Sequence, residues 1–235
     1  MRPTGRSPSN AKNTMRRLYQ LLPILVALAV LAFVWSVPLR AAGGWSSFWD
    51  TSQPSDLTFR LFQLAGLTAF TLVSLQVATG PFMKLWERLY GPGFYKFHAI
   101  QGLSVLLFAL LHPILLGTYL VMEQIDYREF AAQYPWQISL GPIVLALLLV
   151  TVPPAASSIL WNKPFYRRRW HWIHLANYLV FLLAFVHSLG VGTDVSAPSS
   201  QLRPLWWGFF AIWVAGGLYR RVFRVMKEKT HGLST

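Results

Sequence analysis

Cysteine is absent from the sequence, and charged residues are scarce. The lack of thiols excludes disulfide bonds, cysteine-ligated iron–sulfur clusters and thiolate ligation of haem iron. Charged residues make up 12% of the 235 residues, whereas ordinary globular domains have about 25%, and 54% of the residues are hydrophobic. A composition this apolar excludes an ordinary soluble domain and predicts a membrane protein with several spans.

Two nucleotide-binding motifs are also absent. The sequence has no G-x-G-x-x-G that could follow a strand, and it has no P-loop. Both motifs place backbone amides and a helix N-terminus against phosphate groups. We therefore expect that the chain cannot take a hydride from a nicotinamide by itself. No internal repeat is visible in the sequence.

Apolar runs divide the chain into six predicted membrane spans. They cover residues 18–37, 58–79, 94–121, 138–152 with a continuation towards 160, 170–192 and 205–219. The first run resembles a signal peptide in its basic flank, but its length of about 20 residues favours a retained span. We expect an all-α polytopic bundle over residues 18–222, a disordered basic arm over 1–17 and a basic tail over 223–235.

The basic residues sort with alternate loops. Seventeen of the 21 lysines and arginines fall in the N-terminal arm, the second loop, the fourth loop and the tail, together with only two acidic residues. The positive-inside rule then places both termini in the cytoplasm of a multi-pass cell-membrane protein. The net charge of +13 is explained by this topology and by contact with anionic lipid, so no nucleic-acid partner is expected.

Four histidines lie inside the third and fifth predicted spans. His98 and His112 are fourteen positions apart, which is about 21 Å and about 3.9 turns of helix, so they leave nearly the same face. His174 and His187 are thirteen positions apart. Because both spans start on the same side of the membrane, His98 matches His174 in depth and His112 matches His187.

Imidazoles at two matched depths predict haem ligation. Ionisable side chains within a membrane are costly and mark functional sites, and neutral imidazole is a common axial ligand of haem iron in helical bundles. The sequence thus predicts two stacked b haems, each held by two histidines. Thirteen residues leave His174 and His187 about 140° apart on a straight helix. Either this helix is overwound or the haems are approached from its two flanks. We call the haem at the depth of His98 and His174, nearer the cytoplasm, the inner haem, and the haem at the depth of His112 and His187 the outer haem. His171 is the alternative to His174 as a ligand of the inner haem.

Two further polar residues are candidates for cofactor binding. Arg60 is expected at the height of the outer haem, where it would pair with a propionate or attract an anionic acceptor, or where it would simply extend to water at the interface. Gln101 lies one turn from His98 and would bind the edge of the inner haem or make a helix–helix contact. Phe108 and Phe181 are candidates to pack between the haems.

Two segments carry a family resemblance. FHAIQGLSVLLFALLH at 97–112 and HLANYLVFLLAFVH at 174–187 resemble the His-x13-His and His-x12-His helices of the ferric reductase-like transmembrane domain shared by NADPH oxidases and ferric-chelate reductases. LYRRVFRVMK at 218–227 resembles the basic junction that leads to their flavin domain. The resemblance covers roughly residues 58–227. It implies transmembrane electron transfer from a cytoplasmic donor, through two bis-histidine b haems, to ferric chelate, oxygen or a periplasmic protein outside.

The family's oxidases also carry flavin and nicotinamide domains, for which this sequence has no motif. We therefore expect a stand-alone oxidoreductase subunit that needs a separate flavin-containing reductase or another cytoplasmic donor. A second reading is a haem subunit dedicated to a periplasmic enzyme such as a methionine sulfoxide reductase, although that family's pattern lacks a ligand at the position of His98. Two alternatives belong to other functional classes: a haem-free transporter for protons or metal ions, and a structural membrane anchor.

Overall fold

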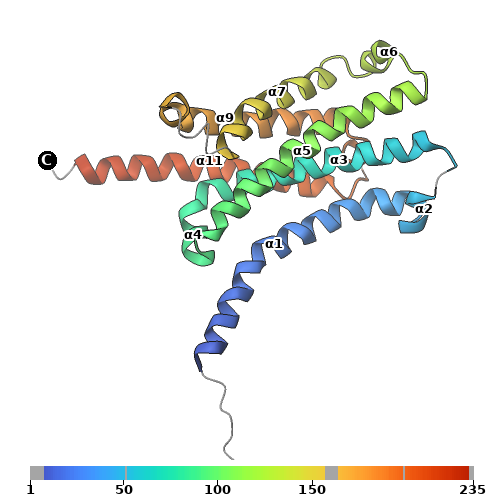
Figure 1. Ribbon diagram of the computed structural model, residues 1–235. Helices are drawn as coiled ribbons and strands as arrows, with labels where there is room; N and C mark the ends of the chain where they lie inside the picture. Colours follow the sequence, from blue (N-terminus) through green and yellow to red (C-terminus); the bar gives the residue numbers. More distant parts are fainter. Residues whose placement is uncertain (1–7, 51, 157–163, 198, 233–235) are drawn as a thin grey trace, which may run out of the picture.

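The computed structural model describes residues 8–50, 52–156, 164–197 and 199–232, and these residues form helices and no strand (Figure 1). The long helices are α1 (Pro8–Ala41), α3 (Pro54–Thr79), α5 (Gly93–Met122), α7 (Gln137–Ala156), α9 (Pro164–Val191) and α11 (Arg203–Gly232). The short ones are α2 (Trp45–Trp49), the 3₁₀ turn η1 (Gly80–Phe82), α4 (Met83–Tyr90), α6 (Tyr127–Ala132) and α10 (Thr193–Ser196). The predicted all-α class is confirmed.

Five stretches of described helix are long and apolar enough to cross a membrane: Leu21–Ala41, Pro54–Tyr90, Gly93–Met122, Gln137–Pro154 and Trp172–Val191. They correspond to the first five predicted spans and identify the chain as a membrane protein. The sixth predicted span lies in α11. Its apolar stretch between Arg203 and Arg220 has sixteen residues, fewer than the roughly 20 that a crossing needs. Helix α1 also extends over residues 8–17 of the expected arm, and α11 over much of the expected tail.

Helix α3 is the central helix of the bundle. In its most apolar window 56% of the residues are buried, compared with 11–17% in the other four spans. Helices α1 and α11 pack against it, and Trp35 of α1 donates a hydrogen bond from Nε1 to the Thr68 hydroxyl at 2.9 Å. This bond satisfies the indole N–H within an apolar interface, where an unpaired donor would be costly.

Four helices form the ring that positions the site. Helices α5 and α9 each pack against both α3 and α7, so α5 and α9 lie diagonally across the ring. A diagonal pair is separated by more than one direct helix–helix contact distance, which is about 8–10 Å. The ring therefore leaves room between α5 and α9, the two helices that carry the four histidines.

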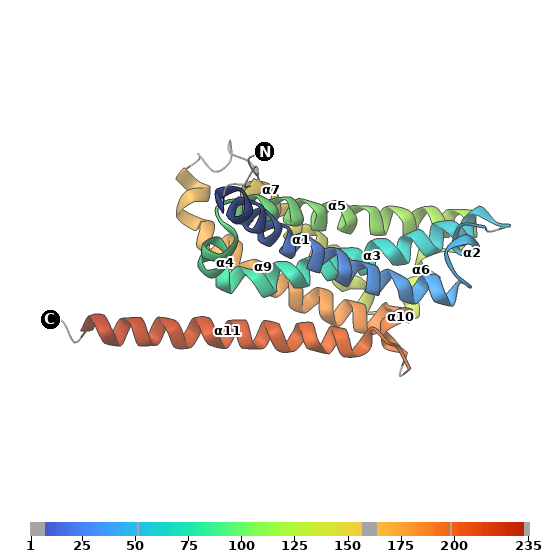
Figure 2. The same ribbon diagram turned by 90° about the horizontal axis from the view of Figure 1, so that it is seen from below.

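The short helices mark the two ends of the bundle. Helices α2, α6 and α10 lie at one end, while α4 and the C-terminal part of α11 lie at the other (Figures 1 and 2). We call the first the acidic end, because it carries Asp50, Asp56, Glu123, Asp126, Glu129 and Asp194. We call the second the basic end, because it carries Lys84, Arg88, Lys96, Arg168 and Arg169. The loops thus sort by charge as the sequence predicts.

The turn between α4 and α5 sets the start of the first histidine helix. Gly91 has a φ of 81°, a left-handed value that only glycine adopts without strain, and it ends α4. Pro92 follows as the N-cap residue of α5. The helix then runs without interruption past His98 and His112, and Pro113 lies directly after the second of them.

Candidate functional site

The structure brings the four histidines together in two pairs. The ring centroids of His98 and His174 are 6.3 Å apart, with 57° between the ring planes. Those of His112 and His187 are 6.4 Å apart, with 89° between the planes. These are the pairs expected from depth matching. Helix α9 is continuous between its two histidines, so an unbroken helix presents both of them to partners on α5.

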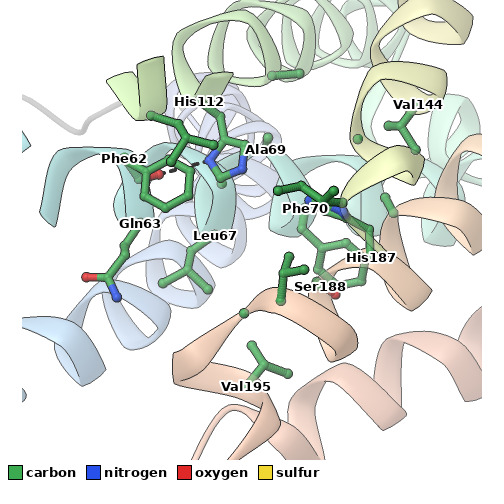
Figure 3. A pocket seen from close by; sticks show the side chains of 18 of the residues that line it. Phe62, Gln63, Leu67, Ala69, Phe70, His112, Val144, His187, Ser188 and Val195 are labelled. Carbon is green, nitrogen blue, oxygen red and sulfur yellow. Dashed lines mark hydrogen bonds between the residues drawn. The ribbon is translucent and has the colours of Figure 1, made fainter. Parts of the chain in front are cut away.

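Each pair lines a cavity inside the four-helix ring. His112 and His187 line a cavity of about 260 Å³ towards the acidic end (Figure 3). His98 and His174 line one of about 50 Å³ towards the basic end. Three apolar residues line both cavities and therefore lie between them: Val73, Val105 and Leu148. Phe108 and Phe181, the aromatic residues expected in this place, line neither cavity, and Phe181 instead stacks on Phe70.

The two histidines nearer the acidic end, His112 and His187, are fixed by backbone carbonyls of neighbouring helices; we call them the outer pair, and we call His98 and His174 the inner pair. Nδ1 of His112 lies 3.0 Å from the carbonyl oxygen of Phe62 on α3, as the dashed line in Figure 3 shows. Nδ1 of His187 lies 2.8 Å from the carbonyl oxygen of Gln137 on α7. A carbonyl oxygen only accepts, so each Nδ1 must carry the proton and donate it. Each neutral imidazole therefore keeps its lone pair on Nε2, the nitrogen left for a metal.

The inner histidine of α5 has a weaker partner. Nδ1 of His98 lies 3.4 Å from the hydroxyl oxygen of Thr79. That hydroxyl donates its own hydrogen to the carbonyl oxygen of Leu75 at 2.9 Å, so its oxygen is left to accept from His98. The inferred tautomer is again the one with a free lone pair on Nε2.

Gln101 lies in the interface between α3 and α5. Its side chain is only 5% exposed, and its amide nitrogen donates to the carbonyl oxygen of Leu72 at 3.5 Å. Its amide oxygen accepts from Gln76 at 3.3 Å, and Gln76 also donates to the carbonyl oxygen of His98 at 2.5 Å. These hydrogen bonds are those of a helix–helix contact, which was one of the two expectations for this residue.

Arg60 binds the C-terminal end of α2. Its Nη1 donates to the carbonyl oxygens of Ser47 and Phe48 at 2.7 and 2.8 Å, and the guanidinium carbon lies 5.7 Å from the centre of the Phe48 ring. The last carbonyls of a helix have no partner within the helix and carry partial negative charge, which a cation offsets. Arg60 does not line either of the two cavities described. Its position therefore ties α2 to α3.

We expect Arg60→Ala to lower the free energy of unfolding by about 1.5–3 kcal/mol, the usual contribution of hydrogen bonds to a charged group. Chemical denaturation in detergent measures the change. Arg128→Ala is the matched control, because it removes the same charge from an exposed side chain at the acidic end. Since Arg60 holds α2, the variant should bind as much haem as the wild type does. Loss of cofactor from a stable Arg60→Ala protein would instead support propionate binding.

A carboxyl group lines the outer cavity, and sequence reasoning missed it. Asp194 is contributed by α10, outside the apolar spans, and burial raises the pKa of its side chain. The folded state then binds the proton more tightly than the unfolded chain does, so stability falls as pH rises above the ordinary pKa of aspartate. Beside it, Gln63 donates to the Thr193 hydroxyl at 3.1 Å and links α3 to α10. A protonated carboxyl in this position can donate a hydrogen bond within the cavity.

One candidate ligand lies outside this description. The side chain of His171 is not among those described, so the choice between His171 and His174 rests on the observed contact of His174 with His98. Among the described residues no three or more histidine, aspartate or glutamate side chains gather as a metal site. The chain matches no family model, no curated protein and no solved structure. Its function must therefore be argued from the site itself.

Proposed function

We propose that the chain is a membrane cytochrome b of the ferric reductase-like kind. It binds two b haems and carries single electrons from a donor at the basic end to an acceptor at the acidic end. The observation that carries this proposal is the pairing of four imidazoles at two depths, across the diagonal of a helical ring. Each pair opens into a cavity, and the space between the cavities is apolar.

The ring separations fit an iron atom held between each pair. Metal–imidazole bonds are about 2.0 Å long, and a five-membered ring with bonds of about 1.33 Å has each nitrogen about 1.1 Å from its centre. Two imidazoles that held one metal ion between them would thus have centres about 6.2 Å apart. The observed separations are 6.3 and 6.4 Å. Rotation about the metal–nitrogen axis leaves the angle between the ring planes free, so 57° and 89° are both compatible with ligation.

The donor sets favour haem over a bare metal ion. A structural metal site usually has four ligands from the protein, and the described residues offer no cluster of three or more such groups. A haem would need only the two histidines of each pair from the protein, because the porphyrin would supply the remaining iron ligands. The outer cavity is also lined mainly by apolar side chains, which suit the face of a porphyrin. When bound, haem supplies reversible one-electron chemistry at the iron.

The protein's own residues bind, orient and insulate. Hydrogen bonds from Nδ1 hold the outer imidazoles in one tautomer and one orientation. Val73, Val105 and Leu148 separate the cavities without a polar side chain, which keeps water out of the space between them. Because the imidazole ligands are neutral, they need no charged partner inside the bilayer.

The topology that goes with this function has six spans. We assign the sixth to the apolar part of α11, which runs alongside the other long helices (Figure 2) and packs against α3 and α9. A span this short is accommodated by local thinning of the bilayer and by Arg203 extending to the interface. An even number of spans returns the chain to its starting side, so both termini are cytoplasmic at the basic end. A cytoplasmic flavin-containing reductase or another donor then meets the basic end. Ferric chelate, oxygen or a periplasmic protein accepts electrons at the acidic end.

Purified wild-type protein should carry two b haems per chain, both six-coordinate and low-spin. The pyridine haemochrome assay counts them, and the spectrum before and after dithionite identifies the spin state. One haem per chain would restrict the function to a single-haem subunit of a periplasmic enzyme. A colourless protein from haem-replete cells would contradict the proposal and favour the haem-free transporter.

A further inference from the structure

Glycine residues lie against both outer histidines. A Cβ atom on Gly66 of α3 would lie 2.7 Å from Cε1 and from Nδ1 of His112. A Cβ atom on Gly141 of α7 would lie 3.3 Å from Cε1 of His187. In both cases the glycine is four residues after the carbonyl that accepts the Nδ1 proton, so the ring lies on the same turn of helix that binds it. The missing side chain is what allows the approach.

The two contacts are related by a constant offset in the sequence. Phe62 and Gln137, Gly66 and Gly141, and His112 and His187 are all 75 positions apart. The same offset relates other residues that line the outer cavity, among them Phe59 and Tyr134, Gln63 and Ile138, Val73 and Leu148, Val105 and Val180, and Ala109 and Ala184. The hairpin α3–α5 and the hairpin α7–α9 therefore contribute residues to the outer cavity at a constant offset of 75 positions. The cavity lies between these two hairpins.

The two inner histidines do not follow the offset of 75 positions. His98 and His174 are 76 positions apart, one more than the offset of the outer site. Gly80 and Gly102 line the inner cavity, but a Cβ on Gly80 would meet nothing within 4 Å and one on Gly102 would meet only Gln76. Neither glycine has the inner rings against it. The close glycine contact is thus a property of the outer pair.

We propose that Gly66 and Gly141 are positioning residues for the outer haem. They let each outer imidazole reach a backbone carbonyl, and so they set its tautomer and the direction of its Nε2 lone pair. This inference rests on the proposed function, because it assigns the two glycines to one of its two haems. His112 is confined most tightly, since its ring also stacks on Phe62 with 4.3 Å between centroids and 16° between planes.

The contact distances rank the two glycines. At 2.7 Å the added methyl of Gly66→Ala overlaps the ring, and the ring cannot move without breaking its bond to the Phe62 carbonyl. At 3.3 Å the ring of His187 needs to move by only a few tenths of an ångström to accept Gly141→Ala. Gly66→Ala should therefore remove the outer haem, whereas Gly141→Ala should keep it with altered ligand geometry. Gly190 of α9 in turn lies against Gln137, the residue whose carbonyl accepts from His187. A Cβ on Gly190 would lie 2.5 Å from Cγ of Gln137.

The test uses the full chain in detergent, with Gly117→Ala as the matched control. Gly117 is on α5, five residues after His112, and a Cβ there would meet nothing within 4 Å. The readouts are haem per chain, the low-spin ferric signals in electron paramagnetic resonance and the thermal midpoint. Gly66→Ala should fall from two haems to one and lose one of two low-spin signals. Gly141→Ala should keep two haems and shift one signal. Gly117→Ala should match the wild type in haem and melt no lower, because alanine favours a helix over glycine.

These outcomes separate the inference from the proposed function. Wild-type protein without haem contradicts the proposed function. Wild-type protein with two haems, together with a Gly66→Ala protein that keeps both haems and both wild-type signals, contradicts the positioning role alone. If Gly66→Ala does not accumulate, Gly141→Ala decides, and an unchanged pair of signals in that variant overturns the inference. A Gly117→Ala protein that loses a haem would also overturn it, since that substitution leaves the docked ring untouched.

Discussion

His112→Ala should lower the haem content from two per chain to one. The methyl group of alanine supplies no lone pair, and His187 alone would leave the outer iron with a single axial ligand from the protein. The inner pair lies in a separate cavity, so its haem should remain six-coordinate and low-spin. The pyridine haemochrome assay measures the halved content, and the remaining low-spin signal in electron paramagnetic resonance should be that of the inner site.

The other histidines make this prediction specific. His187→Ala should leave the same haem and the same signal as His112→Ala, whereas His98→Ala and His174→Ala should both leave the outer one. His171→Ala is the control within the same helix and should keep both haems. A protein that loses its inner haem on replacement of His171, but not of His174, would reassign the inner ligand. Two haems retained in His112→Ala would show that the outer pair does not ligate iron.

The class of the fold and the pairing of the histidines were within reach of the sequence. Apolar runs identified the first five spans because a bilayer fixes the length of a crossing helix. The alternation of charge fixed which histidines share a depth, and the structure places His98 with His174 and His112 with His187. These features depend on local composition and helical geometry, which can be read without knowing the packing.

The partners of the histidines were beyond the sequence because they depend on packing between helices. The carbonyl of Phe62 is fifty residues from His112, and carbonyl groups occur at every position, so no residue type marks the acceptor. Gly66 and Gly141 carried the available signal, since a glycine in an apolar helix often marks a close approach. The offset of 75 is hard to recognise because several of the paired positions carry different side chains, as in Phe62 and Gln137 or in Phe70 and Leu145.

The offset also bears on the expected angle between His174 and His187. His112 and His187 are 75 positions apart, whereas His98 and His174 are 76 positions apart. His174 therefore lies one position after the residue that corresponds to His98 at an offset of 75. One residue turns a helix by about 100°, which changes the direction from which the inner imidazole reaches its cavity. The angle between the ring planes is 57° in the inner pair and 89° in the outer pair. The two sites should therefore be distinguishable by spectroscopy, as the substitutions above require.

Delivery of electrons to an external acceptor should depend on both pairs of histidines in different ways. The chain has no nucleotide-binding motif, so the purified protein should be inert towards NADPH. In proteoliposomes it should be reduced by a small flavin-containing reductase that meets the basic end, and it should then reduce ferric chelate on the opposite side. His98→Ala should block the entry of electrons from the donor. His112→Ala should still accept them at the inner site but should deliver none across the membrane.

Stopped-flow absorbance separates these steps, with donor inside the vesicles and ferric chelate outside, or the reverse. The control His171→Ala should transfer electrons at the wild-type rate. That result would show that replacing a histidine of α9 does not by itself slow transfer. In His112→Ala, reduction of the remaining haem should proceed while reduction of the chelate stops, because the variant has no redox centre in the cavity between the inner site and the acidic end. If His112→Ala reduces the external chelate at the wild-type rate, the outer pair is not on the path and the two-site relay is wrong.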